Sequence, residues 1–166
     1  WFSGDQLAAL DETQIAALSS TQIAAFTTTA LDYLTVTQLA GMTPTQIRGL
    51  AALNSLTPSQ LAGLTSAQIA ALTSTQFSRL SGDQVGSLSA DQIAALTSTQ
   101  LKAITKTEAG ALTATQLQTL TAAQFESLGT AAISGLSDAQ VEVLTSTQLC
   151  TLTRTEMGAL TTTAVQ

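Results

Sequence analysis

Large apolar residues recur along the chain at two places in every eight residues. The repeating octad has the consensus T-x-T-Q-I-A-A-L, with a large apolar residue at position 5 in all octads but one and at position 8 in every octad. A fixed period of this kind is typical of repeat proteins, in which each unit packs on its neighbours. The units form a single array over residues 1–166: nineteen full octads at 3–50 and 57–160, a six-residue unit (AALNSL) at 51–56 and a partial octad at 161–166.

The polar positions of the octad match the start of a short helix. Position 1 is Ser or Thr in seventeen octads, and position 4 is Gln in fifteen and Glu in two. A capping hydroxyl and a Gln or Glu three residues later form a capping box, in which each side chain bonds to the backbone N–H of the other. Pro44 and Pro58 fall at position 2, the first helical residue, where proline is tolerated. Structural capping is predicted for pairs such as Thr43 and Gln46, Thr57 and Gln60, Thr73 and Gln76, Thr97 and Gln100, and Thr145 and Gln148.

The two apolar positions of each octad lie three residues apart and therefore share one face of such a helix. A helix of six or seven residues is not stable alone, so the octads must stack and bury this face. The pattern predicts an all-α solenoid of very short capped helices. Its predicted core includes Ile15, Leu18, Ile69, Leu72, Ile93, Leu96, Leu117 and Leu120.

Other folds fit the octad less well. One continuous helix would rotate the apolar positions by about 80° per octad, so no single apolar stripe would form. In a strand, positions 5 and 8 would point to opposite faces. A β-solenoid remains the alternative, because repeated T-x-T can line one face. For the helical solenoid we expect adjacent octads to alternate in direction, giving a sixteen-residue coil, with three octads per coil also open. The unit at 51–56 marks a phase slip or a kink.

The charged and reactive residues exclude several classes of function. The chain has five Lys and Arg against eleven Asp and Glu, no His, and a single Cys. It therefore lacks a basic surface for nucleic acid or anionic lipid, and also the usual ligands of a zinc site and the base of a His-containing triad. The apolar runs are far shorter than the roughly twenty residues of a membrane span. We expect no enzyme activity, no cofactor, no nucleic-acid partner and no membrane insertion.

A few residues stand outside the repeat or vary within it. Trp1 and Phe2 precede the first octad, and we expect them to act as an assembly contact, either as a cap on the first coil or against a preceding segment or subunit. The chain starts at Trp1 without a charged and then apolar leader, which favours a mature or excised piece of something longer. Cys150 falls at position 6, which is permissive, so we expect it to be exposed. The glutamines are expected mainly to cap helices, with some bonding between stacked coils.

The run Leu-Thr-Ser-Thr-Gln followed by an apolar residue occurs at Leu72–Phe77 and again from Leu96. It resembles the short-repeat tracts, rich in Ala, Leu, Thr and Gln, of very large secreted bacterial surface proteins described as adhesin-like, haemagglutinin-like or haem-utilisation-like. The resemblance covers essentially the whole chain and brings no catalytic motif with it. It implies an extracellular or cell-surface location.

Uniform repeats and sparse charge favour a structural role over a single binding site. We expect a fibre, sheath, filament or adhesin stalk that assembles by stacking coils, either with further copies of itself or with flanking parts of a larger chain. One alternative is a solenoid that binds a protein or glycan through scattered residues such as Tyr33, Arg48 and Arg79. A remote alternative is ice binding through rows of T-x-T threonines.

Overall fold

Every regular element of the chain is helical in the part that the structure describes. The computed structural model describes residues 3–161, and within that range it contains short α-helices, one 3-10 helix and no strand. The predicted all-α class is therefore confirmed, and the β-solenoid alternative finds no support. Trp1 and Phe2, which were predicted to form an assembly contact, lie outside the described residues, as do residues 162–166.

Each octad in residues 3–160 forms one α-helix that begins at its position 2, directly after the capping residue. The short unit forms the 3-10 helix η1, Leu53–Ser55. The first ten α-helices are α1 Gly4–Ala8, α2 Glu12–Ala16, α3 Ser20–Ala24, α4 Thr28–Asp32, α5 Val36–Gly41, α6 Pro44–Gly49, α7 Pro58–Ala62, α8 Ser66–Ala71, α9 Ser74–Phe77 and α10 Gly82–Gly86. The remaining nine are α11 Ala90–Ala94, α12 Ser98–Lys102, α13 Lys106–Ala111, α14 Ala114–Thr119, α15 Ala122–Glu126, α16 Thr130–Ile133, α17 Asp138–Glu142, α18 Ser146–Leu149 and α19 Arg154–Thr161.

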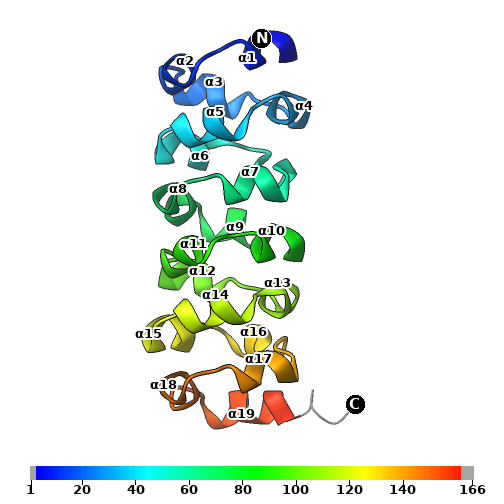
Figure 1. Cartoon of the computed structure of the whole chain (residues 1–166), viewed down its shortest axis with the longest axis vertical. Helices are drawn as coiled ribbons and strands as arrows, with labels where there is room; N and C mark the ends of the chain where they lie inside the picture. Colours follow the sequence, from blue (N-terminus) through cyan, green and yellow to red (C-terminus); the bar gives the residue numbers. More distant parts are fainter. Residues whose placement is uncertain (1–2, 162–166) are drawn as a thin grey trace.

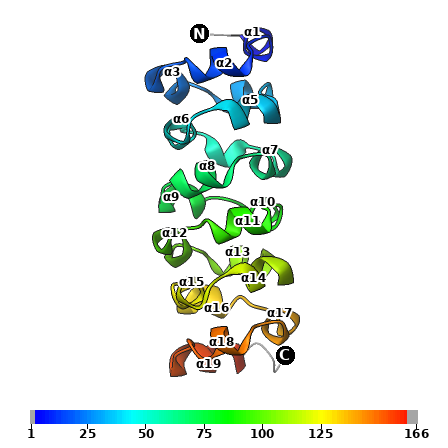
Figure 2. The same ribbon diagram turned by 60° about the vertical axis from the view of Figure 1, so that its left-hand side comes forward.

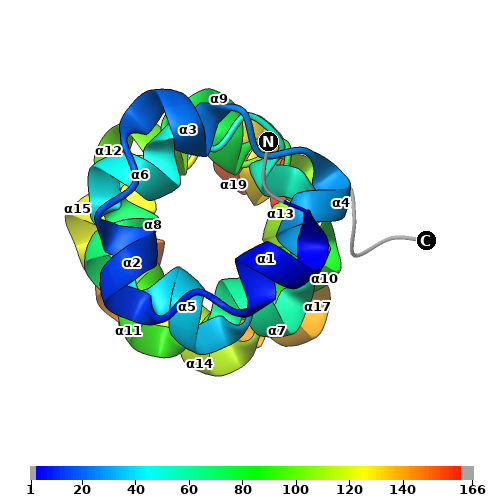
Figure 3. The same cartoon turned by 90° about the horizontal axis from the view of Figure 1, so that it is seen from above.

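The helices follow one another along the long axis of the molecule and around it (Figures 1 and 2). Helix α2 contacts α5, α10 contacts α13, and α13 contacts α16, so each helix packs on the third one along the chain. Seen from above, α1 to α4 nearly complete a ring, and α5 lies between α1 and α2 (Figure 3). One turn therefore takes between three and four octads.

This geometry corrects the predicted coil of two octads that alternate in direction. The N-cap residues of α1 to α18 have similar extended dihedral angles, for example φ −67° and ψ 154° at Thr43 and φ −75° and ψ 161° at Thr113. Because the backbone bends alike at every cap, each octad turns the chain in the same sense and none reverses it. The other possibility was three octads per coil, and three octads make slightly less than one full turn.

Positions 5 and 8, apart from Leu149 and Met157, form one continuous apolar cluster along the described chain. Among the predicted core residues, Ile15, Ile69, Ile93 and Leu117 have no exposed surface. The position-8 residues Leu72, Leu96 and Leu120 are also buried. Leu18 differs from the prediction because it is only half-buried. It belongs to the first coil, where no earlier octad of the described chain covers it.

The six-residue unit at 51–56 replaces one octad and does not interrupt the stack. Leu53 and Leu56 are buried like the residues at positions 5 and 8 of a full octad. Helix α5 contacts α7 and α6 contacts α8, as expected if η1 counts as one repeat between them. The predicted phase slip is thus a shortening by two residues, and the helices continue along the same axis on both sides of it (Figure 1).

Candidate functional site

The glutamine at position 4 closes the capping box of its own helix. In α6, the Thr43 hydroxyl accepts a hydrogen bond from the Gln46 backbone N–H at 3.2 Å, and Gln46 Oε1 accepts one from the Thr43 N–H at 2.8 Å. Both bonds also form in the other predicted pairs, Thr57 and Gln60, Thr73 and Gln76, Thr97 and Gln100, and Thr145 and Gln148. These side chains satisfy backbone donors that the first turn of a helix leaves without partners.

The same glutamine also bonds to the coil that precedes it. Gln100 Nε2 donates to the carbonyl oxygens of Ile69 at 2.8 Å and Leu72 at 2.9 Å, which lie 31 and 28 residues earlier. These acceptors are at positions 5 and 8, at the C-terminal end of a helix, where the Ile69 oxygen also accepts from the Leu72 N–H at 3.2 Å. Such a bond, here called a rung, is made by Gln38, Gln46, Gln60, Gln68, Gln76, Gln84, Gln92, Gln100, Gln116, Gln124, Gln140 and Gln148.

The rungs give each glutamine two simultaneous roles. Its Oε1 starts one helix, and its Nε2 completes the end of another helix about one turn of the stack earlier. Most rung glutamines are buried; Gln68, Gln100 and Gln148 have an exposed fraction of 1%. A buried amide that uses both its oxygen and its nitrogen in this way avoids the desolvation penalty of an unpaired polar group.

A second contact between coils joins position 2 of one octad to position 7 of the third octad along. An added Cβ at Gly4 would overlap the ring of Tyr33, and one at Gly135 would overlap the backbone of Lys106. The large member of each pair thus lies against a glycine. This pairing was not predicted from the sequence. The sequence does contain a signal for this contact, because a large residue and a glycine are paired at positions 29 residues apart.

Glu108 occupies a rung position and makes no rung. Its Oε2 accepts from the Thr105 N–H at 2.7 Å and so closes the capping box. Its Oε1 is buried and has no hydrogen-bond partner, the one such side-chain atom in the described chain. Burial raises the pKa of the Glu108 carboxyl above its ordinary value, although the hydrogen bonds from Thr105 oppose this rise.

Asp11 shows the opposite effect at an N-cap. Its carboxylate accepts from the Thr13 hydroxyl at 2.6 Å and from the Gln14 N–H at 2.8 Å. The Thr13 hydroxyl, followed by the Gln14 N–H, lowers the pKa of Asp11. This aspartate is therefore held ionised at the start of α2, where the helix dipole favours negative charge.

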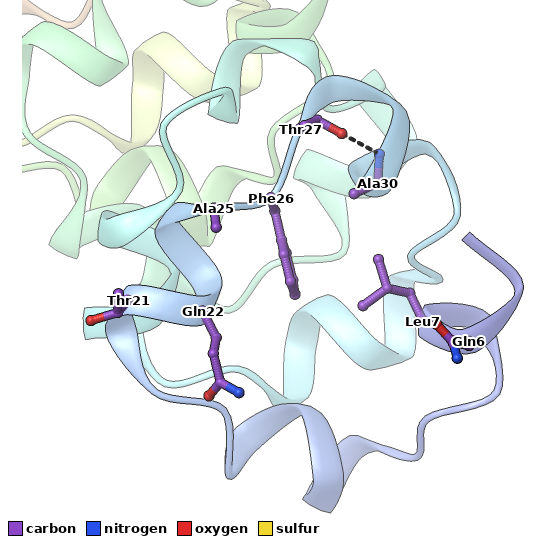
Figure 4. Close-up of a pocket in the computed structure, with 8 residues that line it drawn as sticks. All are labelled: Gln6, Leu7, Thr21, Gln22, Ala25, Phe26, Thr27 and Ala30. Atoms are coloured by element: carbon purple, nitrogen blue, oxygen red, sulfur yellow. Dashed lines mark hydrogen bonds between the residues drawn. The ribbon is translucent and has the colours of Figure 1, made fainter. Parts of the chain in front are cut away.

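At the N-terminal end the stack has an open hollow. A cavity of about 570 Å³ is lined by apolar residues that include Leu7 and Phe26 and by polar residues that include Gln6 and Gln22. The Phe26 ring and the Leu7 side chain project toward the same space, with Gln6 and Gln22 on either side of it (Figure 4).

The C-terminal end exposes residues that are buried elsewhere. Leu149 and Met157 occupy position 5 and are 38% and 47% exposed. At the same octad position, Ile93 and Leu117 in the middle of the array have no exposed surface. Burial at position 5 therefore depends on the octads that follow it in the stack.

The remaining candidate residues do not come together in one place. Cys150 is exposed, as its octad position suggested. Arg48 lines a shallow hollow on the side of the stack together with Pro44 and Ala70. Among residues 3–161, His, Cys, Asp and Glu form no group of three that could hold a metal ion. None of the described helices is long and apolar enough to cross a membrane.

Part of the chain matches a known repeat family. Residues 122–154, which include α15 to α18, match the family model described as ALTTAQ repeat. The six letters correspond to octad positions 7, 8 and 1 to 4, as in Thr119–Gln124 (TLTAAQ). The match supports the prediction of a short-repeat segment. A search of curated proteins found no match to the chain.

Proposed function

We propose that the chain is a segment of an α-solenoid with a structural, non-enzymatic role, serving as a rod-like spacer in an extracellular or cell-surface fibre, sheath, filament or stalk. The observation that supports it most is the rung, because the same bond between coils recurs from Gln38 to Gln148. Between these two residues the rung is missing only where position 4 is Glu108 or Ala132, so the contact between coils is nearly the same along the described array. The proposed location comes from the resemblance to bacterial surface proteins.

The contact between coils explains how such a rod would resist bending. Each rung fixes a helix start to a helix end in the preceding coil, and the apolar cluster continues through every coil. A hydrogen bond of this kind contributes about 0.5–1.5 kcal/mol, so a single rung is weak. The stability of a repeat array is the sum of its nearest-neighbour contacts, so many equal rungs make a stable rod without any one special residue.

The proposal is tested by removing whole repeats. Deletion of residues 97–104 removes one complete octad and leaves every remaining capping box intact. Small-angle scattering should show a folded rod of the same cross-section whose maximum dimension is reduced by one repeat. Circular dichroism should show unchanged helix content per residue.

Deletion of residues 101–104 is the matched control, because it removes half an octad and puts a capping Thr directly after Gln100. This variant should lose helix content and scatter as a partly unfolded chain. A compact, globular scattering profile for the parent chain, or loss of folding in the whole-octad deletion, would overturn the proposed rod.

A further inference from the structure

Two neighbouring helices in the middle of the stack lack the rung that holds the others to the preceding coil. Between Gln38 and Gln148, every full octad makes a rung except those with Glu108 in α13 and Ala132 in α16. Helix α13 contacts both α10 and α16, and these three helices lie one below another on the same side of the stack (Figure 1). The two gaps therefore adjoin each other, and hydrogen bonds between coils are fewer here than elsewhere.

Helix α13 also has a weaker apolar anchor than the other helices. It carries Ala109 at position 5, where every other octad has a large apolar residue. Ala109 has no exposed surface, but its methyl group buries less apolar area than Ile or Leu would. The end of α13 is held from the following coil, because Gln140 donates to the Ala109 and Leu112 oxygens at 3.0 and 2.6 Å. What α13 lacks is thus an attachment to the coil that precedes it.

Glu108 lies where that attachment would form. Its Oε1 is buried without a partner, at the place from which Gln116 Nε2 donates to carbonyls of its preceding coil. By the same offsets of 28 and 31 residues, the acceptors for Glu108 are the Leu80 and Phe77 oxygens, which receive no glutamine amide in the described chain. An ionised carboxylate cannot donate to them, whereas a protonated one carries an O–H that can. One added proton therefore supplies the missing rung.

We propose that Glu108 is a proton-dependent latch, which fixes α13 to the preceding coil in acid and releases it as the pH rises. In the protonated state the Oε1 hydroxyl donates to the Leu80 or Phe77 oxygen, while Oε2 still accepts from the Thr105 N–H. When the proton returns to the solvent, a buried negative charge is left without a donor, and opening of α13 relieves it by admitting water. The inference concerns the stack of coils and goes beyond its proposed role, since it gives the rod one joint that responds to pH.

Other charged groups near α13 do not share this environment. Glu108 is the one buried titratable side chain among residues 3–161, and burial raises the pKa of its carboxyl above its ordinary value. The helices next to α13 and packed on it carry only exposed charges: Arg79 after α9, Asp83 on α10, Lys102 on α12, Lys106 on α13 itself, and Asp138 and Glu142 on α17. Helices α14 and α16 carry none. Because the exposed charges are solvated, their effect on the latch is screened.

The test is hydrogen exchange of single backbone amides in the full chain between about pH 5 and pH 8, corrected for the intrinsic exchange rate at each pH. The N–H groups of Ala109 and Leu112 bond within the octad of α13, so their protection reports its opening. The N–H groups of Leu117 and Leu120 bond in the same way in the octad of α14, which has a rung, and serve as the internal reference.

In the parent chain the protection of Ala109 and Leu112 should fall by about tenfold per pH unit over the range in which opening of α13 releases one proton. The protection of Leu117 and Leu120 should change much less. The Glu108→Gln variant should keep α13 protected at every pH, because an amide donates without taking up a proton. The matched control is Glu126→Gln, at an exposed residue of α15, and it should keep the pH dependence of the parent.

Three results would overturn the latch. They are protection of the α13 amides that does not change with pH, an equal change in the α14 amides, and the same pH dependence in the Glu108→Gln variant. Each of them leaves the proposed rod intact, because that proposal is decided by the deletion of whole repeats and by scattering.

Discussion

Replacing Glu108 with Gln should stabilise the protein at neutral pH. In the neighbouring octads the atom at the place of Glu108 Oε1 is an amide nitrogen, and it donates to carbonyls 28 and 31 residues earlier, as Gln116 does to Leu88 and Val85. The corresponding carbonyls for Glu108 belong to Leu80 and Phe77. An ionised carboxylate can only accept hydrogen bonds, so it cannot make this rung.

The size of the effect follows from what Glu108 lacks. Its side chain is 1% exposed, and Oε1 has no partner. A buried polar group left without a hydrogen bond costs about 1–3 kcal/mol. The Glu108→Gln variant replaces this atom with a donor and keeps the capping oxygen. Its free energy of unfolding at about pH 7 should therefore exceed that of the parent by about 1–3 kcal/mol.

The gain should depend on pH in a defined direction. Because burial raises the pKa of Glu108, the folded state binds its proton more tightly than the unfolded state does. Glu108 therefore does not destabilise the folded protein below the ordinary pKa of a glutamate. Its destabilising effect grows as the pH rises toward the pKa of Glu108 in the folded state, and it is constant above that pKa. Protonated Glu108 can donate from its carboxyl as Gln does, so the variant and the parent should differ little in acid.

The charged side chains on the elements around Glu108 are exposed and should change this pattern little. They are Lys106 on α13, Asp83 on α10 and Arg79 just after α9, while α16 carries no charged residue. Because all three side chains are solvated, their effect on the Glu108 carboxyl is screened.

The assay is urea unfolding followed by circular dichroism at several values between about pH 4 and pH 7.5. Glu142→Gln is the matched control: it removes the same charge at an exposed residue of octad position 6, which makes no rung, so the free energy of unfolding should change little. No gain for Glu108→Gln at neutral pH, or an equal gain in acid, would refute the reasoning.

Two further variants test the rungs and the contact between positions 2 and 7. Gln100→Glu keeps its capping box but loses the rung, so urea unfolding should show a loss of about 2–3 kcal/mol, whereas Gln14→Glu at the N-terminal face should change stability by less than about 0.5 kcal/mol. Equal losses would mean that the rung is not what stabilises the interior. Gly135→Ala should lower stability by about 1–3 kcal/mol or more because its Cβ overlaps the backbone of Lys106, and thermal unfolding should show this directly. Gly158→Ala, where an added Cβ meets no atom within 4 Å, should be neutral or slightly stabilising.

The local structure of each octad was predictable, because it depends on residues at most four positions apart. The pair Thr43 and Gln46 carries the whole signal for a capped helix start, and Ile69 with Leu72 carries the signal for its buried face. The number of octads per turn was not predictable in the same way. It depends on the backbone angles at each cap, and the same pattern of apolar positions is compatible with several sets of such angles.

The predicted bonding of some glutamines between stacked coils is confirmed, and Glu108 shows why the sequence did not reveal how much depends on it. The capping box accepts Gln and Glu equally, so a Glu at position 4 looks like a neutral exchange within one octad. Only the rung to residues 28 and 31 positions earlier distinguishes the two side chains, because it needs a donor. Leu18 was missed for a similar reason, since its burial depends on a coil that the described chain does not place over it.

The direction of the rungs has a consequence for how the chain acquires its structure. Every rung runs from a later glutamine back to carbonyls that entered the chain about thirty residues before, as from Gln68 to Leu39 and from Gln148 to Leu117. A chain that emerges N-terminus first, from a ribosome or through a narrow pore, thus presents the acceptors of each coil before the donors that need them. Each new octad can be ordered on a surface that is already complete, and no contact must wait for a distant part of the sequence. Such a molecule can fold at the pace of its own delivery, whatever the number of repeats that follow.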